Sequence, residues 1–205
     1  MPTNTTQIIL ASSSTYRLQL LAKLGLSFSC ISPDIDETPL RDENIVDMVM
    51  RLSHSKAEAI VKQHPNAIII ASDQSASLDN KAIGKAGNFN NALSQLKSLQ
   101  GKTIDFHTGL AVYNPTNQQY LTALDTTKVH FRNLSEQQLE NYLLTEQPYD
   151  CAGSFKSEGL GIVLFSKIET QDPNALIGLP LIKLVELLDE IGLKLPLKPI
   201  NQITF

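Results

Sequence analysis

Residues 66–78 read NAIIIASDQSASL, and this stretch indicates the fold class. Its unbroken apolar run, Ala67–Ala71, predicts a central strand buried on both faces, the kind that α/β folds contain. Asp73 comes just past the expected end of this strand. Ligands bind and catalytic side chains gather there in open α/β sheets. Asp73 is therefore a candidate to accept a proton from water or to hold a divalent cation. The alternative is an aspartate that caps a turn through its own backbone.

Helical and strand-like segments are mixed along the rest of the chain. Hydrophobic periodicity and end signals predict strands at 7–10, 28–32, 102–113, 119–132 and 160–168, a hairpin around Asp79-Asn80, and helices at 15–24, 45–64, 88–99, 135–145 and 179–191. This order predicts an α/β fold with a mixed twisted sheet and flanking helices. We expect one domain, residues 1–205, with two lobes around a deep cleft. The tail 193–205 carries no pattern that we interpret.

Composition excludes several classes of protein. A formal net charge of −4 gives no general attraction for nucleic acid or an anionic membrane. No apolar run approaches the roughly 20 residues that a membrane-spanning helix needs. Cys30 and Cys151 form no CxxC pair, so we expect buried free thiols in a reducing compartment. These features predict a cytoplasmic protein with no nucleic-acid or membrane partner.

The first strand runs into three serines, Ser12 to Ser14, and a helix starts at once. The first turn of a helix has N–H groups without partners in the helix and the positive end of the helix dipole. Such an end suits a phosphate, and Ser12 and Arg17 could add a hydroxyl and a bidentate guanidinium. The alternative is that Ser14 only caps the helix and Arg17 is a solvated surface charge. No GxxxxGK[ST] motif is present, which argues against a Walker-type ATPase.

Other charged residues suggest a cation-rich site with carboxylates. Lys56 falls on the apolar face of helix 45–64, so it either snorkels to the edge or reaches a negative partner in a cleft. The acidic loop with Asp34, Asp36 and Glu37 is either merely solvated or suited to Mg²⁺ or Mn²⁺ rather than zinc. Lys85 adds a further cation in a turn. Together these features favour phosphoanhydride chemistry over acyl transfer, for which no nucleophile–histidine arrangement stands out.

Eight segments, in order, resemble the Maf family of nucleoside triphosphate pyrophosphatases over residues 7–192. They are LASSSTYRLQLLAKLG, DIDETP, KAEAI, ASDQ, IGK, HTGLAVY, CAGSFKSEGLG and DPNALIGLPL. Tyr16, Gln74 and the FKSEG run with Glu158 resemble one subgroup, the YceF-like 7-methyl-GTP pyrophosphatases.

The resemblance implies an α/β fold with a deep cleft between two lobes, and a possible homodimer. It implies hydrolysis of a nucleoside triphosphate between the α- and β-phosphates, with Mg²⁺ or Mn²⁺ as cofactor. The implied roles are proton acceptor for Asp73, metal binding for Glu37 and Asp73, triphosphate binding for Ser12, Arg17, Lys56 and Lys85, and base selection for Tyr16, Gln74 and Glu158.

Chemistry supports the base assignment. N7-methylation gives guanine a formal positive charge, which an aromatic face such as Tyr16 attracts by roughly 0.5–2 kcal/mol. A carboxylate such as Glu158 favours the same charge and can accept from the N–H edge of the base. Three alternatives stay open: Tyr16 merely packs beside its helix, the substrate is UTP, dTTP or CTP, or the chain is a non-catalytic nucleotide-binding regulator of cell division.

Overall fold

The computed structural model describes residues 6–79 and 81–197, and seven strands of these residues form one mixed sheet. The strand order is β2-β1-β3-β5-β6-β7, with β4 paired to β3. The strands are β1 (Ile8–Leu10), β2 (Ser29–Cys30), β3 (Ile68–Leu78), β4 (Lys81–Ile83), β5 (Thr103–Asn114), β6 (Gln119–Phe131) and β7 (Phe165–Glu169). Strands β2, β1 and β3 run parallel to one another, and the other pairs are antiparallel. The predicted α/β class with a mixed sheet is confirmed.

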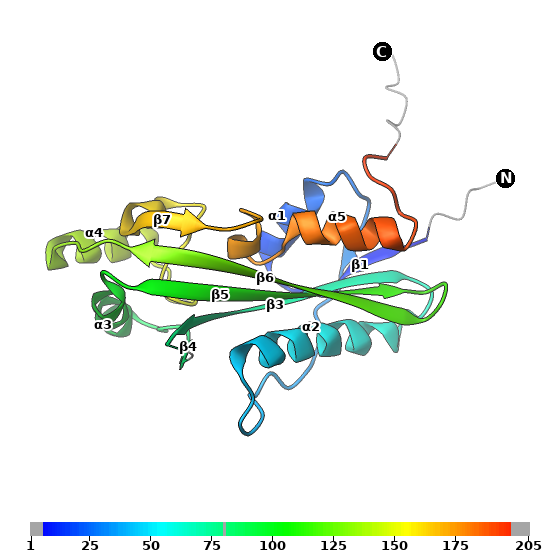
Figure 1. Cartoon of the computed structure of the whole chain (residues 1–205), viewed down its shortest axis with the longest axis horizontal. Helices are drawn as coiled ribbons and strands as arrows, with labels where there is room; N and C mark the ends of the chain where they lie inside the picture. Colours follow the sequence, from blue (N-terminus) through cyan, green and yellow to red (C-terminus); the bar gives the residue numbers. More distant parts are fainter. Residues whose placement is uncertain (1–5, 80, 198–205) are drawn as a thin grey trace, which may run out of the picture.

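Helices lie on both faces of the sheet and at one end of it (Figure 1). They are α1 (Thr15–Ala22), α2 (Ile45–Val61), α3 (Phe89–Leu99), α4 (Glu136–Glu146) and α5 (Leu181–Glu190), with short 3₁₀ helices η1 (Leu160–Leu164) and η2 (Ala175–Ile177). Helix α2 covers one face, and α1 and α5 cover the other (Figure 1). Across the described residues, no helix has both the length and the apolar character needed to cross a bilayer.

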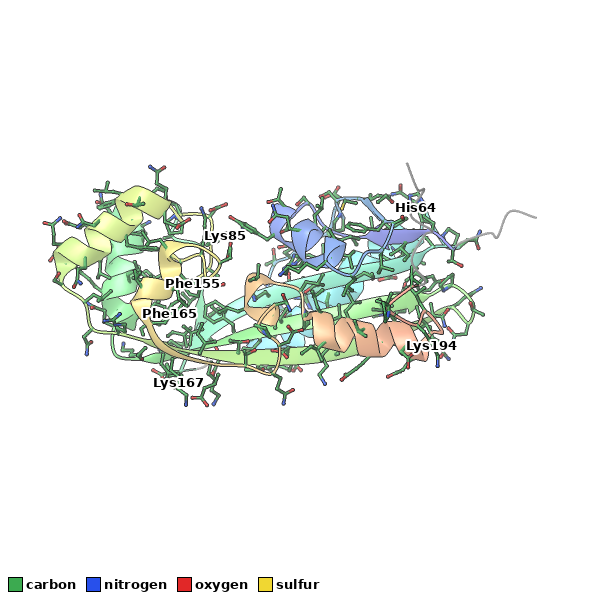
Figure 2. The ribbon with its side chains drawn as sticks, turned by 90° about the horizontal axis from the view of Figure 1, so that it is seen from above. His64, Lys85, Phe155, Phe165, Lys167 and Lys194 are labelled. Atoms are coloured by element: carbon green, nitrogen blue, oxygen red, sulfur yellow. The ribbon has the colours of Figure 1, made fainter. Side chains whose placement is uncertain are left out.

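Separate apolar cores fill the two ends of the molecule. One gathers side chains from α3, α4 and η1, and Phe155 and Phe165, whose ring centroids are 4.7 Å apart, mark it in Figure 2. At the other end, two further cores lie on opposite faces of the sheet, against α1 and α5 and against α2. The long strands β3, β5 and β6 run through both ends. This arrangement agrees with the expected two lobes; that residues 1–205 form a single domain stays a prediction.

Helix α2 packs closely on the sheet because of one glycine. Val49 and Leu52, on the predicted apolar stripe, are buried. A Cβ on Gly109 of β5 would lie 2.5 Å from the carbonyl oxygen of Val49. The absence of a side chain there lets the helix backbone lie against the strand, and this fixes the height of α2 above the sheet.

Strand β3 is longer than expected. The apolar run predicted a strand that ends near Ala71, but β3 continues to Leu78, so Asp73 lies within the strand. The reason is that β3 has different neighbours on its two sides. Strand β5 pairs with it from Ile69 to Ser77, whereas β1 pairs with it only as far as Ile70. The polar half of β3 therefore remains paired with β5 on one side and stays a strand.

Two other expectations are corrected. The strand expected at 160–168 begins only at Phe165, and η1 precedes it. The backbone of η1 turns tightly instead of extending. The Leu160 N–H donates to the Glu146 carboxylate over 2.8 Å, and Gly161 lies too close to the Lys156 carbonyl for any side chain. Both cysteines are free, but Cys30 is exposed on a two-residue edge strand and Cys151 is half-buried.

The other predicted elements agree with the structure to within a few residues. The capping box of Ser135 and Gln138 is present at the start of α4. Strands β3 and β4 form the expected hairpin, although Asn80 of its turn lies outside the described residues. Most of the tail 193–205 lies outside them as well.

Candidate active site

A cavity of about 550 Å³ opens at the edge of the sheet where β1 ends. Strand β1 pairs with β3 only as far as Leu10 and Ile70, and β4 pairs with β3 only from Ala76 onward. The cavity lies beside this open stretch of β3 and continues between α1 and the segment 150–158. In Figure 2, Lys85 lies in the half of the molecule that contains Phe155, beside the space that separates this half from α1.

All nine residues predicted for the site line this one cavity. They come from the β1–α1 turn, α1, the acidic loop, α2, β3, the turn after β4 and the segment before η1: Ser12, Tyr16, Arg17, Glu37, Lys56, Asp73, Gln74, Lys85 and Glu158. The predicted positions are therefore brought together, although they span most of the chain.

The start of α1 is built to present its first turn to the cavity. The Ser14 side chain caps the helix by accepting from the Arg17 N–H over 3.4 Å. The Ser12 hydroxyl accepts from the Ser14 N–H over 3.1 Å, and Ser12 is buried. The capping role and the phosphate-site geometry are thus compatible, because the other N–H groups of the first turn have no partner within the helix.

Arg17 is not a solvated surface charge. Its Nε donates to the Gly178 carbonyl over 2.8 Å, and the Ser72 hydroxyl lies 2.9 Å from the same oxygen. Burial lowers the pKa of Arg17, whereas the negative charges of Asp73 and Glu37 raise it. This anchor uses Nε, so the two terminal nitrogens remain for an anion. Arg17 is a pre-positioned cation.

Lys56 joins the two carboxylates of the site. Its Nζ lies 2.6 Å from Asp73 Oδ1 and 2.8 Å from Glu37 Oε1. Lys56 and Asp73 are each 7% exposed, whereas the Glu37 side chain is 59% exposed. Of the two readings of Lys56, the structure supports the one in which the lysine reaches a negative partner in the cleft.

The donor set around Lys56 fits a hard divalent cation. Two carboxylates converge on one point, and Mg²⁺ commonly takes one or two carboxylates and completes its shell with water and phosphate oxygens. In the described residues no three histidine, cysteine or acidic side chains gather to hold a metal by themselves. A metal at Glu37 and Asp73 would therefore complete its shell with water or with phosphate oxygens of the substrate.

The other end of the cavity is chemically different. Tyr16 lies there with Glu158, Asp150, Cys151 and Lys156. Burial raises the pKa of the Tyr16 hydroxyl; the Lys156 charge lowers it, and Cys151, Glu158 and Asp150 raise it. Lys156 is itself engaged, because its Nζ donates to the Glu146 carbonyl over 3.1 Å. An aromatic ring beside carboxylates suits a cationic base.

The side-chain amide of Gln74, predicted to select the base, is already hydrogen-bonded within the protein. Its Nε2 lies within 2.8–3.1 Å of Thr108 Oγ1 and the carbonyl oxygens of Ala175 and Leu176. The amide nitrogen therefore ties β3 to η2, and only the amide oxygen remains for a ligand. The carbonyls of η2 and Gly178, which receive Gln74 and Arg17, could not be foreseen, because any residue type supplies a carbonyl.

A scan against family models matches residues 7–191 to the model described as "Maf-like protein". The chain belongs to the Maf family. Three similar Maf relatives are each named 7-methyl-GTP pyrophosphatase. The protein of Hydrogenovibrio crunogenus is 57% identical and covers 93% of this chain and 95% of its own. Those of Nitrosococcus oceani and Alcanivorax borkumensis are 50% and 49% identical and cover 90% and 96% of this chain and 93% and 100% of their own.

A solved structure, the Ham1 protein of Staphylococcus aureus, resembles this Maf chain with a TM-score of 0.45 and 17% identity, over 62% of this chain and 72% of its own. This likeness concerns the fold alone and supports no argument about function.

Proposed function

We propose that this Maf protein hydrolyses 7-methyl-GTP between the α- and β-phosphates and releases the nucleoside monophosphate and pyrophosphate, which removes a modified nucleotide. The observation that carries the proposal is the convergence of Asp73, Lys56 and Glu37 in the cavity that Tyr16 also lines. The three relatives, each named 7-methyl-GTP pyrophosphatase, support the same substrate.

Asp73 is the proposed general base. Its Oδ1 accepts from Lys56 over 2.6 Å, which fixes the carboxylate and leaves Oδ2 to accept a proton from the attacking water. Glu37 and Asp73 would hold Mg²⁺ or Mn²⁺, which supplies Lewis-acid chemistry and neutralises phosphate charge when bound.

The triphosphate is proposed to lie along the cations of the cavity. The first turn of α1, Ser12 and the terminal nitrogens of Arg17 would receive phosphate oxygens. Lys85, in an exposed turn tied to Ala152 by a single β-bridge, would contact the chain of phosphates from the opposite lobe. Lys56 would divide its three donors between the carboxylates and a phosphate.

The methylated base is proposed to stack on Tyr16, with Glu158 beside its positive charge. The attraction of a cationic ring for an aromatic face is worth about 0.5–2 kcal/mol. Gln74 would offer its amide oxygen, because its nitrogen is bound to η2. A cytoplasmic location and a homodimer stay predictions.

The test is pyrophosphate release with Mg²⁺ and Mn²⁺ from 7-methyl-GTP, GTP, UTP, dTTP and CTP, with Asp73→Asn as the control. We expect the highest kcat/KM for 7-methyl-GTP and a loss of about 10²–10⁴-fold in the variant. Preference for a pyrimidine nucleotide would contradict the base assignment but would leave the proposed hydrolysis reaction standing. No release from any nucleotide would contradict the proposed activity and favour a nucleotide-binding regulator.

A further inference from the structure

An ion pair outside the cavity links helix α2 to the acidic loop, residues 33–44, which carries both Glu37 and Glu43. Arg51 donates from Nε to Glu43 Oε1 over 2.6 Å and from Nη2 to Glu43 Oε2 over 2.7 Å. The side chains are 27% and 8% exposed, so this bidentate pair is largely shielded from water. Paired planar hydrogen bonds of this kind fix geometry as well as charge.

Apolar burial does not hold this loop in place. Every residue from Asp36 to Asp42 is exposed, including Leu40 at 58%. The side chains of Arg41 and Asp42 at the tip are 96% and 90% exposed. In Figure 1 the loop before α2 projects away from the sheet. Because residues 36–42 bury no side chain, polar contacts must offset the conformational entropy that this segment loses when it keeps one shape.

The polar contacts of the loop converge on the Arg51–Glu43 pair. Arg51 Nη2 also donates to the Thr38 carbonyl over 3.3 Å. Glu43 Oε2 also accepts from the Leu40 N–H over 3.0 Å. A local turn, in which Asp36 accepts from the Thr38 N–H over 2.9 Å, encloses Glu37. The backbone next to Glu37 is thereby tied to α2.

The same helix supplies the partner of Glu37. Lys56 follows Arg51 on α2 by five residues, and its Nζ lies 2.8 Å from Glu37 Oε1. The distance between Glu37 and the lysine therefore depends on how the loop is tied to Arg51. We propose that Arg51 and Glu43 are positioning residues that hold Glu37 at the metal and phosphate end of the cavity. This inference rests on the proposed function for the role of Glu37.

The experiment measures Mn²⁺ binding by electron paramagnetic resonance in the presence of a non-hydrolysable α,β-methylene nucleotide, together with kcat/KM for 7-methyl-GTP. The variants are Arg51→Lys and Glu43→Gln, which retain size and lose the paired geometry or the charge. Arg41→Gln removes a positive charge from the exposed tip of the same loop and is the matched control. Urea unfolding checks that each variant is folded at the assay temperature.

We expect Arg51→Lys and Glu43→Gln to weaken Mn²⁺ binding and kcat/KM by about 10- to 100-fold, as loss of supporting partners around metal ligands does, with Arg41→Gln unchanged. In a Glu37→Gln background the same substitutions should change neither quantity further, because the group that they position is gone. Equal losses in both backgrounds, or unchanged Mn²⁺ binding, would overturn the proposal. A wild type that binds Mn²⁺ but hydrolyses no nucleotide would contradict the proposed function instead. The Mn²⁺ affinities of the variants in the wild-type and Glu37→Gln backgrounds would still test the positioning role.

Discussion

Lys56 Nζ lies 2.6 Å from Asp73 Oδ1, and through this contact helix α2 and strand β3 meet in the cavity. The lysine also touches Glu37, so a single positive charge lies between the two carboxylates proposed to bind metal. Lys56 therefore has two proposed roles. It offsets part of the negative charge of the two carboxylates when no nucleotide is bound, and we expect it to turn toward a phosphate when a nucleotide binds.

Lys56→Met should therefore bind Mn²⁺ more tightly than the wild type in the absence of nucleotide. Removing a positive charge from within hydrogen-bond distance of both carboxylates should raise the affinity by at least about tenfold. The same variant should lose activity, because a phosphate contact is gone. Paramagnetic titration of Mn²⁺ measures the affinity, with Lys85→Met as the control that should not change it. Equal or weaker Mn²⁺ binding by Lys56→Met would show that the lysine does not compete with the cation.

Arg17→Lys should raise KM for every nucleotide by a similar factor, about 10- to 100-fold. Lysine cannot donate to the Gly178 carbonyl and at the same time form a paired contact with phosphate. Steady-state kinetics with 7-methyl-GTP and GTP compare the two substrates. A loss confined to the methylated nucleotide would place Arg17 at the base and not at the phosphates.

The stability of the protein should carry an acid-dependent contribution from Glu43. The Arg51 hydrogen bond lowers the pKa of Glu43 from 4.5 to about 2. Because the folded-state pKa is depressed, this contribution is present in full above pH 4.5 and is lost as the pH falls toward 2. Urea unfolding at pH 6 and pH 3 should show a smaller decrease in the free energy of unfolding for Glu43→Gln than for the wild type. An equal decrease in both would contradict the assignment.

Gly109→Ala should destabilise the fold by about 1–3 kcal/mol, since overpacking forces backbone shifts. The new methyl group would lie 2.5 Å from the Val49 carbonyl oxygen, which is backbone and cannot rotate away. Thermal unfolding measures the effect, and Gly84→Ala, where no atom lies within 4 Å of the added Cβ, is the matched control. A Gly109 variant as stable as its control would mean that α2 can lift from the sheet at no cost.

Most elements could be predicted from the sequence, and the nine residues predicted for the site all line the cavity, because hydrophobic periodicity and family motifs are local signals. The errors arose where structure depends on distant partners. The end of β3 depends on which neighbour pairs with it, and β1 stops while β5 continues. The carbonyl of Gly178 became visible as a partner of Arg17 only in the fold.

The Arg51–Glu43 pair shows the same limit for charged residues. In the sequence, Glu43 belongs to an acidic, turn-rich loop, and Arg51 is one charge in an amphipathic helix. Nothing in that pattern distinguishes them from solvated residues. Their bidentate contact depends on the path of the loop, which brings Glu43 back onto α2.

The central claim is that one cavity joins hydrolysis at the phosphates to selection of a methylated, positively charged base on Tyr16. The most direct measurement is the ratio of kcat/KM for 7-methyl-GTP to that for GTP, in the wild type and in Tyr16→Ala, with Tyr16→Phe as the matched control. We predict that Tyr16→Ala lowers this ratio by about 2- to 30-fold, the range that a cation on an aromatic face is worth, while Tyr16→Phe retains it. An unchanged ratio in Tyr16→Ala, with both substrates losing activity equally, would contradict the claim.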